Sequence, residues 1–174
     1  MPLTATAGLA DGYNYIGDID LKSETSLEVT AGIDWSGERI RFTPEVFYRD
    51  VSDFIQGTPS TNEDANRYSL MATGRLPLQY GNVDAELYGF DLGYEWRIAT
   101  PLLLRGTLSY VRGKRTDAPD NLYRIAPITS FIELIYQFQR GFFAVESLAA
   151  ARQDDVAAYN AEQSTSGWGI VNLR

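Results

Sequence analysis

Seven polar side chains near the ends of predicted strands, next to the long connecting segments, could bind an anionic ligand. Arginine donates paired N–H bonds to a carboxylate or to an anionic metal chelate. Tyrosine offers a flat ring to a planar chelate. The candidate ligand-binding residues are therefore Arg49, Asp53, Arg112, Arg115, Tyr123, Arg124 and Gln153.

A structural role is the alternative for charged residues of this kind. Side chains that lie opposite one another on neighbouring strands can pair by charge and hold the sheet together. This alternative is favoured for charges near the strand centres, where it predicts a ladder of ion pairs formed by Arg41, Glu45, Arg105, Glu133 and Glu146. It also competes with ligand binding for the residues near the long segments.

Enzymatic activity has little support, and we predict no catalytic residue, no metal site and no cofactor. The chain has no cysteine and no histidine, which excludes the Ser-His-Asp triad, thiolate chemistry and the usual zinc sites. Adjacent acids such as Asp154 and Asp155 could in principle form an acid/base pair or a weak calcium or lipopolysaccharide-bridging site. Solvated surface acids are the simpler interpretation.

Length and charge narrow the class of protein further. The 174 residues are enough for one domain. The net charge of −8 and the pI of about 4.5 argue against a nucleic-acid partner, because phosphate binding needs clustered Lys and Arg. The longest apolar run is shorter than the roughly 20 residues that a transmembrane helix requires.

The elements that must position the candidate residues are long strands with a period of two. Within residues 39–50 one face is mostly charged and the other is apolar, carrying Ile40, Phe42, Pro44, Val46 and Tyr48. The pattern recurs along the chain. It predicts about seven antiparallel strands, at 26–35, 39–56, 79–98, 102–115, 125–138, 142–153 and 167–174.

The connections between these strands alternate between tight turns and long loops. Together with the two-faced strands, this asymmetry is typical of an up-and-down transmembrane β-barrel, apolar outside and polar inside. Aromatic residues gather near both ends of the predicted apolar band, where a membrane interface would lie. The predicted girdles contain Trp35, Phe42, Tyr48, Tyr88, Trp96, Tyr110, Tyr136, Phe138 and Phe143.

An odd number of strands does not fit a complete bacterial barrel, whose strand number is even. An open sheet in lipid would leave unpaired backbone groups at both edges. We therefore expect these residues to be part of a larger barrel that strands elsewhere in the protein, or in another chain, close.

Several segments resemble TonB-dependent outer-membrane receptors. Residues 15–26 (YIGDIDLKSETS) are similar to a "GNPDLKPETS" stretch of that family, which leads into a strand ending in tryptophan, here Trp35. Residues 47–57 (FYRDVSDFIQG) resemble a "FYRRVDDYIQG" pattern, and residues 82–93 (NVDAELYGFDLG) resemble "NVDAELYGAELG". The ordered set is more specific than any single motif.

The resemblance implies a location in the bacterial outer membrane and a barrel of roughly 22 strands around a plug. It implies import of a scarce ligand such as a ferric siderophore, a small-molecule metal chelate, driven by an energy-coupling inner-membrane complex. The residues present would form part of the barrel, without the plug or the C-terminal strands. Outer-membrane lipid and the rest of the receptor would be the partners.

Two other hypotheses remain open from the residues alone. A small stand-alone barrel could act structurally or as a passive pore. A soluble β-sheet binding protein could use the same alternation to build an ordinary core.

Overall fold

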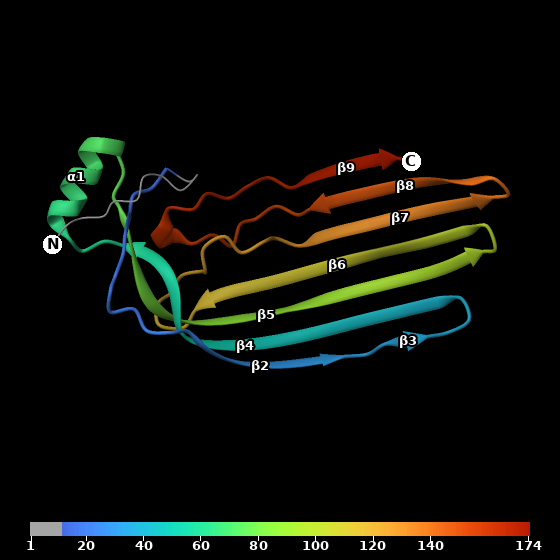
Figure 1. Cartoon of the computed structure of the whole chain (residues 1–174), viewed down its shortest axis with the longest axis horizontal. Helices are drawn as coiled ribbons and strands as arrows, with labels where there is room; N and C mark the ends of the chain where they lie inside the picture. The colour runs from blue at the N-terminus through green and yellow to red at the C-terminus, as the bar shows by residue number, and fades with distance from the viewer. Residues whose placement is uncertain (1–11) are drawn as a thin grey trace.

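The computed structural model describes residues 12–174, which form one curved, almost entirely antiparallel sheet (Figure 1). Its strands follow the chain order β2-β4-β5-β6-β7-β8-β9, each antiparallel to the next. The bounds are β2 (Thr25–Gly32), β4 (Ile40–Pro59), β5 (Leu78–Ala99), β6 (Leu102–Arg115), β7 (Thr129–Phe138), β8 (Gly141–Ala150) and β9 (Trp168–Leu173). The predicted antiparallel up-and-down fold is confirmed.

Two short strands complete the nine-stranded sheet. β1 (Tyr15–Ile16) pairs in parallel with β5, and β3 (Trp35–Ser36) pairs with β4. Residues 125–128, which were predicted as strand, lie outside β7. Pro127 is one reason, because proline has no backbone N–H to donate to the ladder. The ladder between β6 and β7 accordingly ends at Ser109 opposite Thr129.

The sheet has two open edges. Within residues 12–174, β2 and β9 each pair with one long neighbour only, and no ladder joins β2 to β9. Every residue of both strands is exposed. The predicted lack of closure within these residues is therefore observed.

β4 and β5 are much longer than a membrane crossing needs. They contain 20 and 22 residues, or about 66 Å and 73 Å at roughly 3.3 Å per residue. The hydrocarbon core of a bilayer is only about 30 Å thick, so the β4–β5 hairpin extends well beyond it even with a strong tilt. All tight turns lie at the opposite end of the sheet from this extension (Figure 1).

The segment between β4 and β5, predicted to be a loop, contains the helix α1 (Glu63–Thr73). Asn62 caps its first turn, since its side-chain oxygen accepts the Ala65 N–H at 3.0 Å. Gly74 ends the helix in the left-handed conformation and donates its N–H to the Leu70 carbonyl. The abundance of Thr, Asn and Asp suggested a loop, but some of these residues supply the cap.

Replacing the capping residue, Asn62→Ala, should destabilise α1 locally by about 1 kcal/mol, because the first-turn N–H groups lose their acceptor. Hydrogen exchange measured by mass spectrometry should show faster exchange across residues 63–73 and unchanged exchange in the β4–β5 ladder. Asn62→Asp retains an acceptor and serves as the control. Equal protection in Asn62→Ala and wild type would contradict the capping role.

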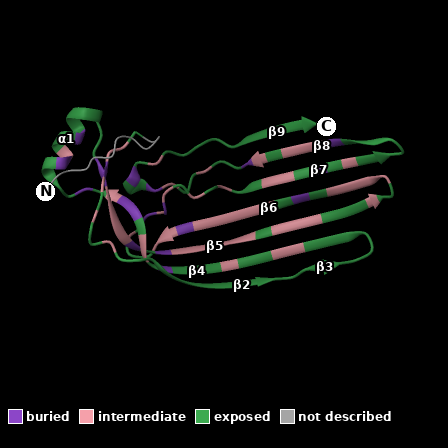
Figure 2. Cartoon of the chain, viewed as in Figure 1, coloured by how far each residue is buried: buried purple, intermediate pink, exposed green. Residues whose placement is uncertain are grey.

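Most of the buried residues gather at the long-loop end of the sheet, whereas the strands are exposed or half-buried along most of their length (Figure 2). The hydrophobic cluster there consists of Val51, Ala85 and Leu122, with Phe54, Leu87 and Ile125 against it. No helix in the described part of the chain is both long enough and apolar enough to cross a membrane.

Candidate functional site

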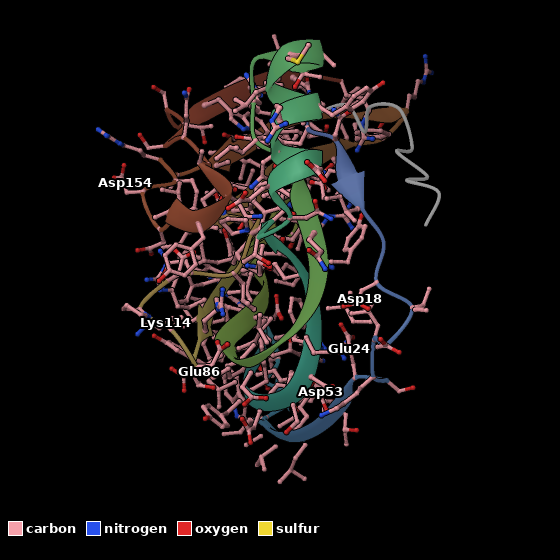
Figure 3. All side chains as sticks on the ribbon, turned by 90° about the vertical axis from the view of Figure 1, so that its left-hand side faces the viewer. Asp18, Glu24, Asp53, Glu86, Lys114 and Asp154 are labelled. Carbon is pink, nitrogen blue, oxygen red and sulfur yellow. The ribbon has the colours of Figure 1, made fainter. Side chains whose placement is uncertain are left out.

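The strand register divides the side chains between two faces of the curved sheet. Glu86 and Lys114 are opposite one another in the β5–β6 ladder and lie on the convex face. Seen from the loop end, they lie on one side of the molecule, and Asp18 and Glu24 lie on the opposite side (Figure 3). Loop residues cover the other face at Gly113, where an added Cβ would meet Leu122 and Ile125 at 2.9–3.0 Å. The concave face is therefore the one onto which the loops fold.

All nine predicted girdle aromatics fall on the convex face by register. Tyr48 is opposite Tyr88, and Tyr136 is opposite Phe143. Most of the nine are about half exposed although they are large and apolar. A broad apolar surface of this kind marks a face that contacts something other than water. Their role as membrane girdles remains a prediction.

The concave face carries a row of charges across the sheet. Arg105 donates through Nε to Glu133 Oε2 at 2.5 Å, and Arg174 donates to Glu133 Oε1 at 2.6 Å and pairs with Glu146 at 2.9 Å. Glu133 is completely buried. Three of the five residues of the predicted ladder, Arg105, Glu133 and Glu146, are thus joined by ion pairs. Arg41 pairs instead with Asp34, because that acid follows β2 close to the start of β4.

Nearer the long-loop end, two loops fold onto this face and are held there by a buried polar network. Asn160 donates to the Gly57 carbonyl at 2.6 Å and accepts from Gln56 Nε2 at 3.4 Å. The Gln56 side-chain oxygen accepts the Tyr123 N–H at 3.0 Å. Gln56 and Asn160 are both buried. The network links β4 to loop 116–128 and to loop 151–167, and we call these two loops the rim loops.

A second contact joins the rim loops to each other. The Asp120 carboxylate accepts the N–H groups of Ala158 and Tyr159 at 2.7 and 3.0 Å. These two residues begin the short helix η1 (Ala158–Asn160). Asp120 thus satisfies backbone donors that would otherwise lack a partner.

Two arginine–tyrosine pairs lie on the rim loops or beside them. The Arg115 guanidinium lies 5.4 Å from the centre of the Tyr159 ring, and the Arg124 guanidinium lies 5.0 Å from that of Tyr123. The Arg115 guanidinium is also paired with Asp117 and its side chain is only 9% exposed. The exposed pair of Arg124 and Tyr123 is therefore the one that presents a cation beside a flat ring. Arg124 adopts a left-handed backbone conformation, with φ of 62°, which is uncommon for a residue with a side chain.

The structure brings three of the seven candidate residues together and separates the others. Gln153 donates to the Ile125 carbonyl beside Tyr123 and Arg124. The Arg115 side chain instead contacts Asp117 and Tyr159. Arg112 is opposite Tyr88 in the ladder, so the register puts it on the convex face, where it binds Asn121 and Asp155. Arg112 therefore lies on the opposite face of β6 from Arg115.

The other two candidates lie beside β2. Arg49 pairs with Glu28 across the β2–β4 ladder. Asp53 occupies the bulge of β4, has a φ of 58°, and lies 3.7 Å from the Lys22 ammonium. Neither residue contacts the rim loops through an observed ion pair.

Sequence reasoning missed the polar residues that position the rim loops: Gln56, Asp120, Tyr159, Asn160 and Glu162. A uniformly polar loop sequence gives no indication of which amide will be buried. The only local signal is the Asp-Asn pair at 120–121 before an apolar residue, a composition that favours turns.

The Asp117 carboxylate should make loop 116–128 sensitive to acid. Hydrogen bonds from the Arg115 guanidinium, at 2.7 and 2.9 Å, lower the pKa of Asp117, and partial burial opposes this. Because the folded pKa lies below the unfolded one, the interaction stabilises the loop at neutral pH and is lost as the pH falls through the folded pKa.

Hydrogen exchange corrected for its intrinsic pH dependence should therefore show residues 116–120 opening below about pH 4. In the Asp117→Asn variant, the corrected exchange of residues 116–120 should not change as the pH is lowered through this range. A wild-type loop whose protection does not change with acid would contradict the prediction.

Comparison with known proteins gives a consistent result. The family model described as "TonB dependent receptor-like, beta-barrel" matches residues 2–174. No curated protein matches the sequence. Among solved structures, the copper transporter OprC is similar over 90% of this chain and 24% of its own, with a TM-score of 0.76 and 19% identity.

Two further structures show the same fold. The siderophore receptor PirA from Acinetobacter baumannii has a TM-score of 0.64 and 16% identity over 92% of this chain and 26% of its own. The FrpB iron transporter from Neisseria meningitidis has a TM-score of 0.63 and 13% identity over 92% and 25%. The chain therefore spans about a quarter of the length of the solved structures it matches.

Proposed function

Because the chain belongs to the TonB-dependent receptor β-barrel family, we propose that it is part of the barrel of a bacterial outer-membrane transport protein that imports a scarce ligand, a ferric siderophore. The observation that carries this proposal is the two-faced sheet. Its convex face presents half-exposed aromatic and aliphatic side chains, and its concave face carries ion pairs and polar loops. Lipid outside and water inside would require this division.

The ligand is inferred from the arginine–tyrosine pair that loop 116–128 exposes. Arg124 and Tyr123 combine a cationic guanidinium group with a flat ring, whereas Arg115, beside Tyr159, is already paired with Asp117. An anionic chelate with planar metal-binding groups fits that chemistry. The names of similar structures include a siderophore receptor, iron transporters and a copper transporter, which supports a metal or its chelate as cargo.

Other parts of the receptor, or other proteins, would close the barrel and supply the energy for transport. The open edges at β2 and β9 need further strands, from the same receptor or from another chain. A plug inside the barrel and an energy-coupling inner-membrane complex would make transport active. The soluble-protein alternative is disfavoured by the extent of the exposed apolar convex face.

The test is uptake of radioactive iron, supplied as several chemically defined siderophores, by cells with and without the intact gene. We expect uptake of at least one ferric siderophore to be lost on deletion and restored by the wild-type gene. Tyr123→Ala combined with Arg124→Ala should restore uptake poorly, whereas Arg140→Ala, at a tight turn far from the rim loops, should restore it fully.

Two outcomes would contradict parts of the proposal. Protein released from membranes by buffer without detergent would refute the barrel location. If deletion of the gene abolished copper uptake and left the uptake of every iron chelate unchanged, a ferric siderophore would be refuted as the ligand. The proposed transport function would still hold.

A further inference from the structure

Tyr123 and Arg124 form a turn in one rim loop, and side chains from other parts of the chain hold that turn in place. The Tyr123 N–H donates to the side-chain oxygen of Gln56 in β4 at 3.0 Å. The Arg124 N–H donates to Glu162 Oε1, in the other rim loop, at 3.1 Å. Both backbone N–H groups of the turn are thus bonded to acceptors outside their own loop.

The backbone of Arg124 has a conformation that brings its side chain over the neighbouring ring. In an extended chain, adjacent side chains point in opposite directions, so an arginine directly after a tyrosine would ordinarily point away from the ring. The left-handed φ of 62° changes that direction, and the Arg124 guanidinium lies 5.0 Å from the centre of the Tyr123 ring. A residue with a side chain keeps this conformation only where the surrounding structure holds it. The stacked pair therefore depends on contacts that fix the Arg124 backbone.

Glu162 is suited to hold that backbone because its own position is fixed by two hydrogen bonds. Its Oε2 accepts the Ala157 N–H at 2.8 Å, and its N–H donates to the Ala157 carbonyl at 3.1 Å. Ala157 is completely buried, and Glu162 is half-buried. Oε1 accepts the Arg124 N–H, and the negative charge of the carboxylate strengthens this bond. One carboxylate thus connects a buried point of one rim loop to the turn of the other.

Other contacts that hold the rim loops do not involve Glu162. Asp120 accepts two N–H groups at the start of η1, and Asn160 bonds to two residues of β4. Loss of the Glu162 side chain should therefore leave both loops folded onto the sheet and release the Arg124 backbone.

We propose that Glu162 is a positioning residue, which holds the Arg124 guanidinium over the Tyr123 ring in the arrangement that receives an anionic chelate. The inference rests on the proposed function for the ligand and for nothing else. Glu162 acts through the Arg124 backbone and does not contact the ligand. A cation and a ring that are fixed together beforehand lose less conformational freedom on binding, so the effect should appear in affinity rather than in the rate of transport.

The first test reports on the Tyr123 ring without any ligand. Meta-fluorotyrosine is placed at this position of the purified intact receptor, and its fluorine NMR resonance is recorded. Arg124→Ala gives the resonance of a ring without the guanidinium. We expect Glu162→Ala to move the resonance most of the way to that value, and to have no further effect when it is added to Arg124→Ala. Asp154→Ala, which removes a carboxylate paired with Arg152 in the same loop as Glu162, should leave the resonance unchanged.

The second test is the concentration dependence of iron uptake by cells, with the ferric siderophores used to test the proposed function. Glu162→Ala should raise the KM for uptake about tenfold and leave the maximum rate within about twofold of the wild-type rate. Added to Arg124→Ala, it should change the KM by less than about twofold, because the side chain that it positions is gone. A residue that only stabilised the loops would add its effect to that of Arg124→Ala. Asp154→Ala should retain the wild-type KM.

Three results would overturn the proposal. The first is a fluorine resonance that Glu162→Ala leaves unchanged. The second is an effect of Glu162→Ala, in either test, that is just as large in the Arg124→Ala background. The third is loss of hydrogen-exchange protection at Ala158 and Tyr159 in Glu162→Ala, which would make Glu162 a general support of the rim loops. Failure of wild-type cells to take up any ferric siderophore would refute the proposed function, whereas the fluorine resonances would still decide whether Glu162 holds Arg124.

Discussion

Leu108→Arg is expected to lower the free energy of unfolding in a lipid bilayer by about 2–4 kcal/mol, whereas Ser109→Arg should change it by less than about 1 kcal/mol. Leu108 is opposite Leu92 and Ser130 on the convex face, midway along β6 between the rows that contain Trp96 and Tyr88. A guanidinium there would lie at the depth where lipid is least polar. Ser109 is on the concave face opposite Asp91, which a new cation could pair with.

The measurement is reversible urea unfolding of the intact receptor in lipid vesicles. The adjacent positions make the comparison a matched one, since both variants gain the same side chain in the same strand. Equal destabilisation by the two substitutions would contradict the division of the sheet into a lipid face and a water face. The same pair in detergent should differ less, because a micelle adapts to a charge more easily than a bilayer does.

Arg105→Met is expected to cost about 3 kcal/mol of folding free energy, because it removes a partner from a completely buried carboxylate. Glu133 accepts from Arg105 on one oxygen and from Arg174 on the other. Without Arg105 the second bond alone must offset the loss of hydration of Glu133. Adding Glu133→Gln removes the buried charge and should recover most of the loss.

Arg152→Met is the control for Arg105→Met. Arg152 also donates through Nε to one carboxylate, that of Asp154. Both side chains of that pair are about 60% exposed, so water replaces the lost partner and the expected cost is below about 0.5 kcal/mol. A double variant no more stable than Arg105→Met alone would show that the buried charge is not the cause.

The sequence was sufficient for the sheet because the physical signal is repeated along every strand. The alternation of Ile40, Phe42 and Val46 with polar neighbours fixes a face for each residue, and the tight turns fix the order of the strands. The same pattern predicted that Arg105 and Glu133 belong to a ladder of ion pairs, since both lie on the polar face. The alternation of side chains with a period of two thus predicted both the fold and part of the ladder of ion pairs.

The rim loops could not be predicted in the same way, because their positions depend on single long-range contacts. Nothing near Asn160 in the sequence indicates that its amide will bond the Gly57 carbonyl, and nothing near Asp120 indicates that it will hold the start of η1. The face of Arg112 follows from a different rule. Arg112 lies two residues from Tyr110 on the same strand, so both side chains are on the convex face.

The bond between Asn160 and Gly57 joins residues separated by 103 positions, and this separation sets an order of events in time. Closing so long a segment is entropically costly, whereas each hairpin closes locally. The strands from β4 to β8 must therefore be side by side before the rim loops can lock. A sheet caught part-way through folding would leave the rim loops without the contacts that hold them, so the surface that they form depends on the assembled strands β4 to β8.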